Sequence, residues 1–120
     1  MNNSKKRILL VDDEFDITFA LSMGLEDNGF VVDTFNDPLL ALQSFKQKEK
    51  NKKESYALAL IDIKMPKMNG FELYNEIRKI DDKVCFITAF DIKKEDVKCL
   101  IRKPVFIGDL VKRVRAEILN

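Results

Sequence analysis

Short apolar runs alternate with longer segments of helical spacing along this chain. The runs are rich in β-branched residues and too short for helices, which favours strands at Ile8–Val11, Phe30–Phe35, Tyr56–Ile61, Val84–Phe90 and Cys99–Ile101. Apolar side chains recur every three or four residues in the segments between them, which predicts helices at 14–28, from Asp37-Pro38 onward, from about Gly70 and at 107–119. This order indicates βαβ units with right-handed crossovers. The sequence therefore predicts an α/β fold with a doubly wound, five-stranded parallel sheet covered by helices on both faces.

The second helical segment begins with a cap. Asp37 suits the N-cap position, and Pro38 suits the first turn, where its missing N–H costs nothing. Leu39, Leu42 and Phe45 recur on one side, so we expect them to line the buried face of this helix.

Composition limits the possible roles of the chain. At 120 residues, with 46% hydrophobic and 34% charged residues, it has the make-up of one globular domain. A net charge of +1 with mixed signs gives no field that would attract nucleic acid or a membrane surface, so neither is expected as a partner. The apolar run Ile8–Val11 is too short for a signal peptide or a membrane span, and we expect a cytoplasmic location. Without histidine, the chain can build no imidazole-based catalytic triad.

The two cysteines, Cys85 and Cys99, have neither metal-ligand spacing nor a CxxC pattern. In a cytosolic protein this favours buried, reduced thiols. A disulfide between them remains the open alternative.

Five residues with chemical potential stand at or near the ends of the predicted strands. Asp12 and Asp13 follow the first strand, Asp62 follows the third, Thr88 lies late in the fourth, and Lys103 follows the fifth. Ligands of doubly wound sheets bind beyond these ends, so the five residues form one candidate site. Three carboxylates at one edge repel one another, and a hard cation such as Mg²⁺ would relieve that repulsion.

A carboxylate beside a bound cation can act as a nucleophile toward phosphorus. Asp62 is the best-placed acceptor because it ends the run ALALID just before the tight loop KMPKMNG. Lys103 and the Thr88 hydroxyl would then contact the phosphoryl oxygens.

The motifs LLVDDE, LIDIKMPKMNGFEL, ITA and KP, in this order, resemble the receiver domain of two-component response regulators over roughly residues 6 to 119. The resemblance implies a flavodoxin/CheY-like sheet with strand order 2-1-3-4-5. It also implies Asp62 as phosphoacceptor, Thr88 and Lys103 as its phosphoryl contacts, and a cis Lys103-Pro104 bond. The Mg²⁺ ligands implied are Asp13 directly, Asp12 through water, Asp62 and the backbone carbonyl of Lys64.

The function implied is that of a signalling module with residues 1–120 as a single receiver domain and no effector domain. It would take a phosphoryl group from a sensor histidine kinase and switch a surface that a downstream protein target reads. It would be no enzyme beyond the transfer and loss of its own phosphoryl group. One alternative is a receiver-like adaptor that acts without phosphorylation. Another is a Mg²⁺-dependent phosphatase, which Lys64 disfavours because that position would need an aspartate.

Three positions depart from the family pattern. Leu100 stands where an aromatic residue is usual, three positions before Lys103. Only fourteen residues separate Thr88 from Lys103. We therefore expect the fourth helix, at about Lys93–Lys98, to be shortened or missing. In the family this helix belongs to the common dimerisation surface, so we expect the usual homodimer through that surface to be absent. Lys64 and Phe90 occupy positions that, in the family, tune the access of hydrolytic water to the phosphoryl group. A lysine and a phenyl ring at these positions predict slow self-dephosphorylation.

Overall fold

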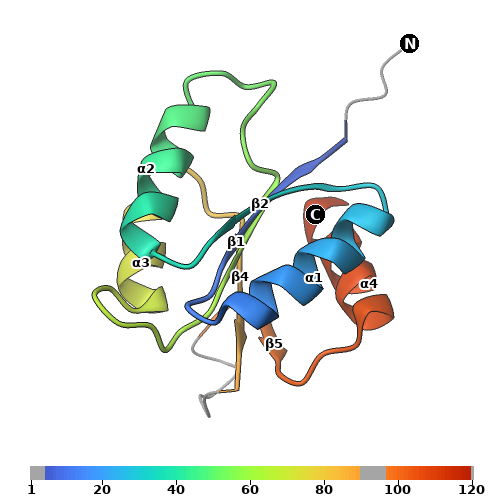
Figure 1. The fold of residues 1–120 in the computed structure, drawn as a ribbon. Coiled ribbons are helices and arrows are strands. Elements are labelled where there is room, and N and C mark those ends of the chain that lie inside the picture. The colour runs from blue at the N-terminus through green and yellow to red at the C-terminus, as the bar shows by residue number, and fades with distance from the viewer. Residues whose placement is uncertain (1–4, 90–96, 120) are drawn as a thin grey trace.

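The computed structural model describes residues 5–89 and 97–119. Five parallel strands form one sheet in the order β2-β1-β3-β4-β5 (Figure 1). Their bounds are β1 Arg7–Val11, β2 Val31–Phe35, β3 Leu58–Ile61, β4 Val84–Thr88 and β5 Leu100–Arg102. The order confirms the expected 2-1-3-4-5 topology, in which β1 and β3 lie at the centre of the sheet.

Helices cover both faces of this sheet. They are α1 Phe15–Asp27, α2 Pro38–Lys48, α3 Gly70–Ile77 and α4 Ile107–Leu119. Figure 1 shows α1 and α4 on one face and α2 and α3 on the other. The doubly wound arrangement predicted from the alternation of strands and helices is therefore present.

The two faces of the sheet bury separate apolar clusters. In β1, Ile8 and Leu10 belong to the cluster beneath α1 and α4, whereas Leu9 and Val11 belong to the cluster beneath α2 and α3. All four side chains are fully buried. Burial on both faces explains why the central strands read as continuous apolar runs rather than alternating ones.

Helix α2 begins as the sequence predicts, and its buried side matches the prediction except at Leu39. The Asp37 carboxylate accepts a hydrogen bond from the Leu39 backbone N–H at 2.9 Å, which confirms the cap. Phe45 is buried as expected, and Leu42 is partly buried against the same cluster. The expected burial of Leu39 is wrong, because its side chain is 51% exposed, while Ala41 is buried instead. The apolar stretch PLLAL at the start of this helix fits more than one helical phase, so spacing alone does not choose the buried face.

The predicted short helix at about 93–98 falls mainly on residues 90–96, which lie outside the described residues, as does Phe90. The fourth helix among the described residues, α4, follows β5 and is present with 13 residues. None of the helices among these residues combines the length and the apolar composition that a membrane span requires.

The cysteine pair corrects one expectation. Cys85 and Cys99 are buried as predicted, but they form a disulfide rather than reduced thiols. The parallel register pairs Phe86 with Leu100, so Cys85 on β4 lies opposite Cys99, with a Cα–Cα separation of 4.6 Å. This juxtaposition depends on strand register, which the spacing of cysteines in the sequence does not reveal.

Candidate functional site

Three carboxylates meet at the carboxyl ends of the two central strands. Asp12 and Asp13 follow β1, and Asp62 follows β3, whose Ile61 pairs with Val11 of β1. One carboxylate oxygen from each aspartate lies within 4.8 Å of the other two. Asp12 and Asp62 are buried, and Asp13 is exposed at the mouth of the site. The predicted acidic cluster is therefore present.

Lys103 reaches this cluster from the end of β5. Its Nζ lies 2.5 Å from a carboxylate oxygen of Asp12 and 3.7 Å from one of Asp62. The Lys103 backbone N–H donates to the Thr88 carbonyl at 2.9 Å, which joins the ends of β4 and β5. The predicted cis peptide between Lys103 and Pro104 is confirmed.

The electrostatics of the site reflect this crowding. Burial, and then the negative charge of Asp12, raise the pKa of Asp62 above its ordinary value, although Lys103 and a hydrogen bond from Thr88 oppose the shift. Burial would lower the pKa of Lys103, but its hydrogen bond to Asp12 and the nearby carboxylates outweigh burial and raise it. Asp62 is thus held in an environment that disfavours its charge, and Lys103 in one that favours it.

Asn36 fixes Asp12 from the end of β2. The Asn36 side-chain amide donates to the Asp12 backbone carbonyl at 2.7 Å and to the Thr18 hydroxyl at 3.2 Å. The Asp12 carboxylate itself accepts a hydrogen bond from the Glu14 backbone N–H at 3.0 Å. Sequence reasoning missed Asn36 and Thr18, although Asn36 follows a predicted strand at the same edge of the sheet.

Gly70 lets α3 approach the Asp62 loop. A Cβ at this position would lie 2.4 Å from the Asp62 backbone carbonyl oxygen and 2.8 Å from the Ile63 Cα. The Gly70 N–H donates to the Ile63 carbonyl at 2.8 Å, and Asn69 and Glu72 form a capping box at the same helix start. The loop after Asp62 is therefore held by the start of α3, at a distance that excludes any side chain.

The residues present suit a hard divalent cation. An all-oxygen donor set from three carboxylates, beside an open depression, is the set that Mg²⁺ prefers. Lys64, which the resemblance predicts as a ligand through its backbone carbonyl, also lines this depression. Its lining residues are Asp13, Glu14, Asp62, Lys64, Met65, Pro66, Thr88, Ala89 and Lys103.

Strand order, two helical layers and a polar site beyond the strand ends define an α/β domain of the flavodoxin-like type. The family model of the response regulator receiver domain matches residues 8–117. The chain therefore belongs to the receiver domain family of two-component response regulators.

Two curated relatives show how the chain compares with longer and shorter proteins. It is 37% identical to a transcriptional regulatory protein CpxR homolog of Haemophilus influenzae, over 92% of the chain and 49% of that protein. The chain thus spans about half the length of that relative. It is 33% identical to the response regulator receiver protein CpdR of Brucella abortus, over 95% of the chain and 98% of that protein.

Solved structures agree with this assignment. A CheY-like receiver domain protein from Methanospirillum hungatei superposes with a TM-score of 0.82 at 30% identity, covering 96% of this chain and 94% of that one. The response regulator TrrA from Thermotoga maritima, solved in complex with Mg²⁺ and BeF, gives 0.78 at 30% identity, covering 93% and 98%.

Proposed function

We propose that this chain accepts a phosphoryl group on Asp62 in a Mg²⁺-dependent reaction and acts as the switch module of a two-component system. One observation carries the proposal. The carboxylate oxygens of Asp12, Asp13 and Asp62 lie within 4.8 Å of one another, and the Lys103 ammonium lies 3.7 Å from Asp62. An acceptor, cation ligands and a counter-charge for the phosphoryl group thus stand in one open depression.

Four groups would hold the cation: the carboxylates of Asp12, Asp13 and Asp62 and the backbone carbonyl of Lys64. When bound, Mg²⁺ would offset the carboxylate charges and those of the phosphoryl oxygens. The complex of TrrA with Mg²⁺ and BeF supports this assignment, because that protein shares the fold and 30% of its residues with this chain.

The chain's own residues account for the transfer. A carboxylate oxygen of Asp62 attacks the phosphorus of a phosphohistidine, the P–N bond breaks, and the donor imidazole leaves with the bonding electrons and takes up a proton. The product is an acyl phosphate on Asp62. Lys103 and the Thr88 hydroxyl, both beside Asp62, would bind the phosphoryl oxygens as charge moves onto them.

Receiver domains interact with histidine kinases and with other signalling proteins, as the CheX–CheY complex from Borrelia burgdorferi shows for that pair. For this chain, the surface that suits a phosphohistidine donor is an apolar groove beside the site. It shares Ala89 and Lys103 with the acidic depression and continues along α1 and the segment between β5 and α4, through Ile17, Ala20, Leu21, Pro104 and Val105. Exposed Phe15 and Phe19 stack on α1 with ring centroids 6.1 Å apart and extend this apolar surface. We assign the groove to a sensor histidine kinase.

Phosphorylation would also supply the switch. A phosphoryl group carries about two negative charges in place of the single charge of the Asp62 carboxylate, next to Lys103, which now pairs most closely with Asp12. Lys103 would then move from Asp12 toward the phosphoryl oxygens, and its movement would alter the surface formed by β5 and the start of α4. A downstream protein that reads this surface would receive the signal.

Incubation with acetyl phosphate and Mg²⁺ tests the proposal, with intact-mass measurement in acid as the readout. We expect one phosphoryl group per chain, none without Mg²⁺, and none in Asp62→Asn. Phosphorylation of the Asp62→Asn variant to the wild-type level would refute the assignment of Asp62. No incorporation under any condition would favour an adaptor that works without phosphorylation, and repeated hydrolysis of a phosphomonoester would favour a phosphatase.

A further inference from the structure

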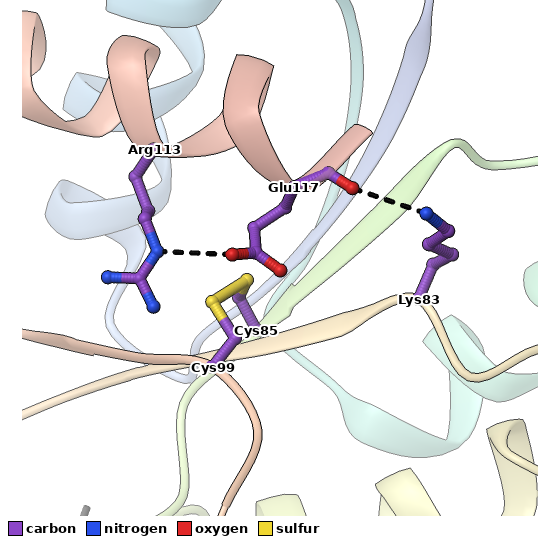
Figure 2. Close-up of a disulfide and its surroundings, with 5 residues drawn as sticks. All are labelled: Lys83, Cys85, Cys99, Arg113 and Glu117. Carbon is purple, nitrogen blue, oxygen red and sulfur yellow. Dashed lines mark hydrogen bonds and ion pairs between the residues drawn. A yellow bond between two sulfur atoms is a disulfide. The ribbon is translucent and has the colours of Figure 1, made fainter. Parts of the chain in front are cut away.

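The disulfide lies between two strands that end at the acidic site. Cys85 is on β4, three positions before Thr88, and Cys99 immediately precedes β5, four positions before Lys103. Both cysteines are buried, at 0% and 1% exposure, beneath α4 (Figure 2). At about 3.3 Å per strand residue, the disulfide is roughly 10 Å from the residues that contact Asp62.

The strand that this disulfide holds is short and lies at the edge of the sheet. β5 has 3 residues and pairs only with β4 among the described strands. Backbone hydrogen bonds close both ends of the pairing: Phe86 N–H to the Cys99 carbonyl and Lys103 N–H to the Thr88 carbonyl, each 2.9 Å. The disulfide therefore adds a covalent link at one end of a small ladder whose other end carries Thr88 and Lys103.

Charged groups from the neighbouring elements surround the sulfurs. A carboxylate oxygen of Glu117, on α4, lies within 4.8 Å of both sulfur atoms (Figure 2). The Arg113 Nε donates to the Glu117 carboxylate at 3.3 Å, and the Lys83 Nζ donates to the Glu117 backbone carbonyl at 3.2 Å. Glu117 is partly exposed, whereas both cysteines are buried, so a reagent reaches the sulfurs only through local opening at α4. Exchange at this buried pair is therefore slow.

We propose that Cys85 and Cys99 form a redox-modification site whose oxidation fastens β5 to β4 and thereby holds Lys103 and Thr88 at the acidic site. A disulfide in a cytosolic chain, the location expected here, is generally transient and redox-sensing. The oxidant is a small-molecule disulfide. One cysteine thiolate attacks it and releases a thiolate, and the second cysteine then displaces the other half. In total, two thiols lose two electrons and two protons, and the small disulfide becomes two thiols.

This redox site deepens the proposed function, because its output is the rate of phosphorylation at Asp62. In the oxidised form, the start of β5 cannot move away from β4, so Lys103 and Thr88 stay in position for the incoming phosphoryl group. In the reduced form, the same residues depend on the short ladder and on core packing. We expect the oxidised form to be phosphorylated about threefold to tenfold faster.

The experiment compares the intact chain after oxidised glutathione with the same chain after dithiothreitol. Free thiols are counted in denaturant, melting temperature is measured, and hydrogen exchange is followed at Leu100–Lys103. Phosphorylation by acetyl phosphate with Mg²⁺ is then timed. We expect the oxidised form to melt about 10 °C higher and to exchange more slowly at β5.

The double variant Cys85→Ala/Cys99→Ala is the matched control, and the two reagents should leave all its readouts equal. If that variant does not fold, Cys85→Val/Cys99→Val, which keeps more of the core volume, serves the same purpose. Two free thiols that persist after the oxidant would overturn the proposal, as would equal exchange at β5 or an oxidised form phosphorylated no faster. If neither form takes up phosphoryl, the proposed function fails, whereas exchange at β5 still decides whether the disulfide holds that strand.

Discussion

Lys103 lies closer to Asp12 than to Asp62: its Nζ is 2.5 Å from the first carboxylate and 3.7 Å from the second. Asp12 has no exposed surface, and its backbone carbonyl is held by Asn36. The lysine therefore neutralises the more deeply buried carboxylate and leaves Asp62 facing the depression. The proposed acceptor thus lines the depression, and the proposed counter-charge lies within reach of it.

Replacing Lys103 by methionine should destabilise the protein and make it depend on a cation. The substitution keeps the length of the side chain but leaves Asp12 and Asp62 without their nearest positive charge. Because Asp12 is buried, we expect a loss of about 2–3 kcal/mol in the free energy of unfolding without Mg²⁺. Added Mg²⁺ should restore more stability to the variant than to the wild type. Urea unfolding with and without Mg²⁺ measures both effects.

Lys98→Met is the matched control for this prediction. Lys98 forms an ion pair with Asp82, but its side chain is 74% exposed. An exposed pair of this kind contributes little to stability, so Lys98→Met should cost far less than Lys103→Met, and Mg²⁺ should not change the result. Equal losses in the two variants would contradict the view that the Lys103–Asp12 pair is special.

Asp62→Asn should raise the free energy of unfolding at pH 7 by about 1 kcal/mol, because the folded site disfavours the charge that the substitution removes. Burial and the charge of Asp12 raise the pKa of Asp62, so the folded state disfavours its ionised form. Asparagine keeps the shape and removes the charge. Asp13→Asn, at an exposed position, should change stability less. Denaturant unfolding of the wild type, Asp62→Asn and Asp13→Asn without Mg²⁺ measures these differences in the free energy of unfolding.

The pH dependence gives this prediction a definite sign. A raised pKa in the folded state means that wild-type stability is complete below the ordinary aspartate value and is lost as pH rises through the raised value. The advantage of Asp62→Asn should therefore vanish at about pH 3 and be complete at pH 7. An advantage that grows as pH falls would contradict the assigned shift.

The sequence predicted the parts of this molecule that depend on local pattern and on strand ends. Asp12, Asp62, Thr88 and Lys103 meet because parallel strands end at one edge of the sheet, and that edge can be located from the order of elements alone. The disulfide depends on strand register, and the exposure of Leu39 depends on helical phase, and neither can be read from residue spacing alone. Asn36 escaped notice because a backbone carbonyl is its principal partner.

Leu100 shows what a departure from the family pattern means in the fold. Its side chain is 6% exposed and belongs to the apolar cluster beneath α2 and α3, together with Phe86. Phe106, the nearest aromatic residue in sequence, is 76% exposed. The position that usually carries an aromatic ring thus contributes here to the core.

Gly70→Ala should damage both stability and the candidate site. The new Cβ would lie 2.4 Å from the Asp62 backbone carbonyl, and backbone atoms cannot move aside cheaply. We expect a loss of about 2 kcal/mol and weaker stabilisation by Mg²⁺, because the Asp62 loop must shift. Gly108→Ala, in α4, is the control. Apart from its chain neighbours and its own helix backbone, no atom of the described residues lies within 4 Å of the new Cβ, and helix propensity should raise stability by about 0.5–1 kcal/mol. Thermal unfolding of both variants with and without Mg²⁺ tests the contrast, and similar outcomes would contradict it.

Tyr56→Phe should cost about 1–2 kcal/mol at pH 7 and progressively less above pH 10. The buried Tyr56 hydroxyl donates to Asp33 at 2.6 Å, and Asp33 is also held by Arg7. Burial, and then this hydrogen bond, raise the pKa of Tyr56, so the folded state favours the neutral phenol. Its contribution is complete below the ordinary tyrosine pKa and is lost as pH rises through the folded value.

The other tyrosine is the control for that prediction. Tyr74 donates to Asp82 at 2.7 Å, but this bond is exposed, so Tyr74→Phe should cost less than Tyr56→Phe. The chain has two tyrosines and no tryptophan, so absorbance titration of each variant follows the remaining tyrosine alone. We expect Tyr56 to ionise at a higher pH than Tyr74, because burial is the largest cause of its shift and Tyr74 is far less buried. If Tyr56 ionises at the lower pH of the two, its hydroxyl is neither buried nor hydrogen-bonded to Asp33 in solution, and the prediction is wrong.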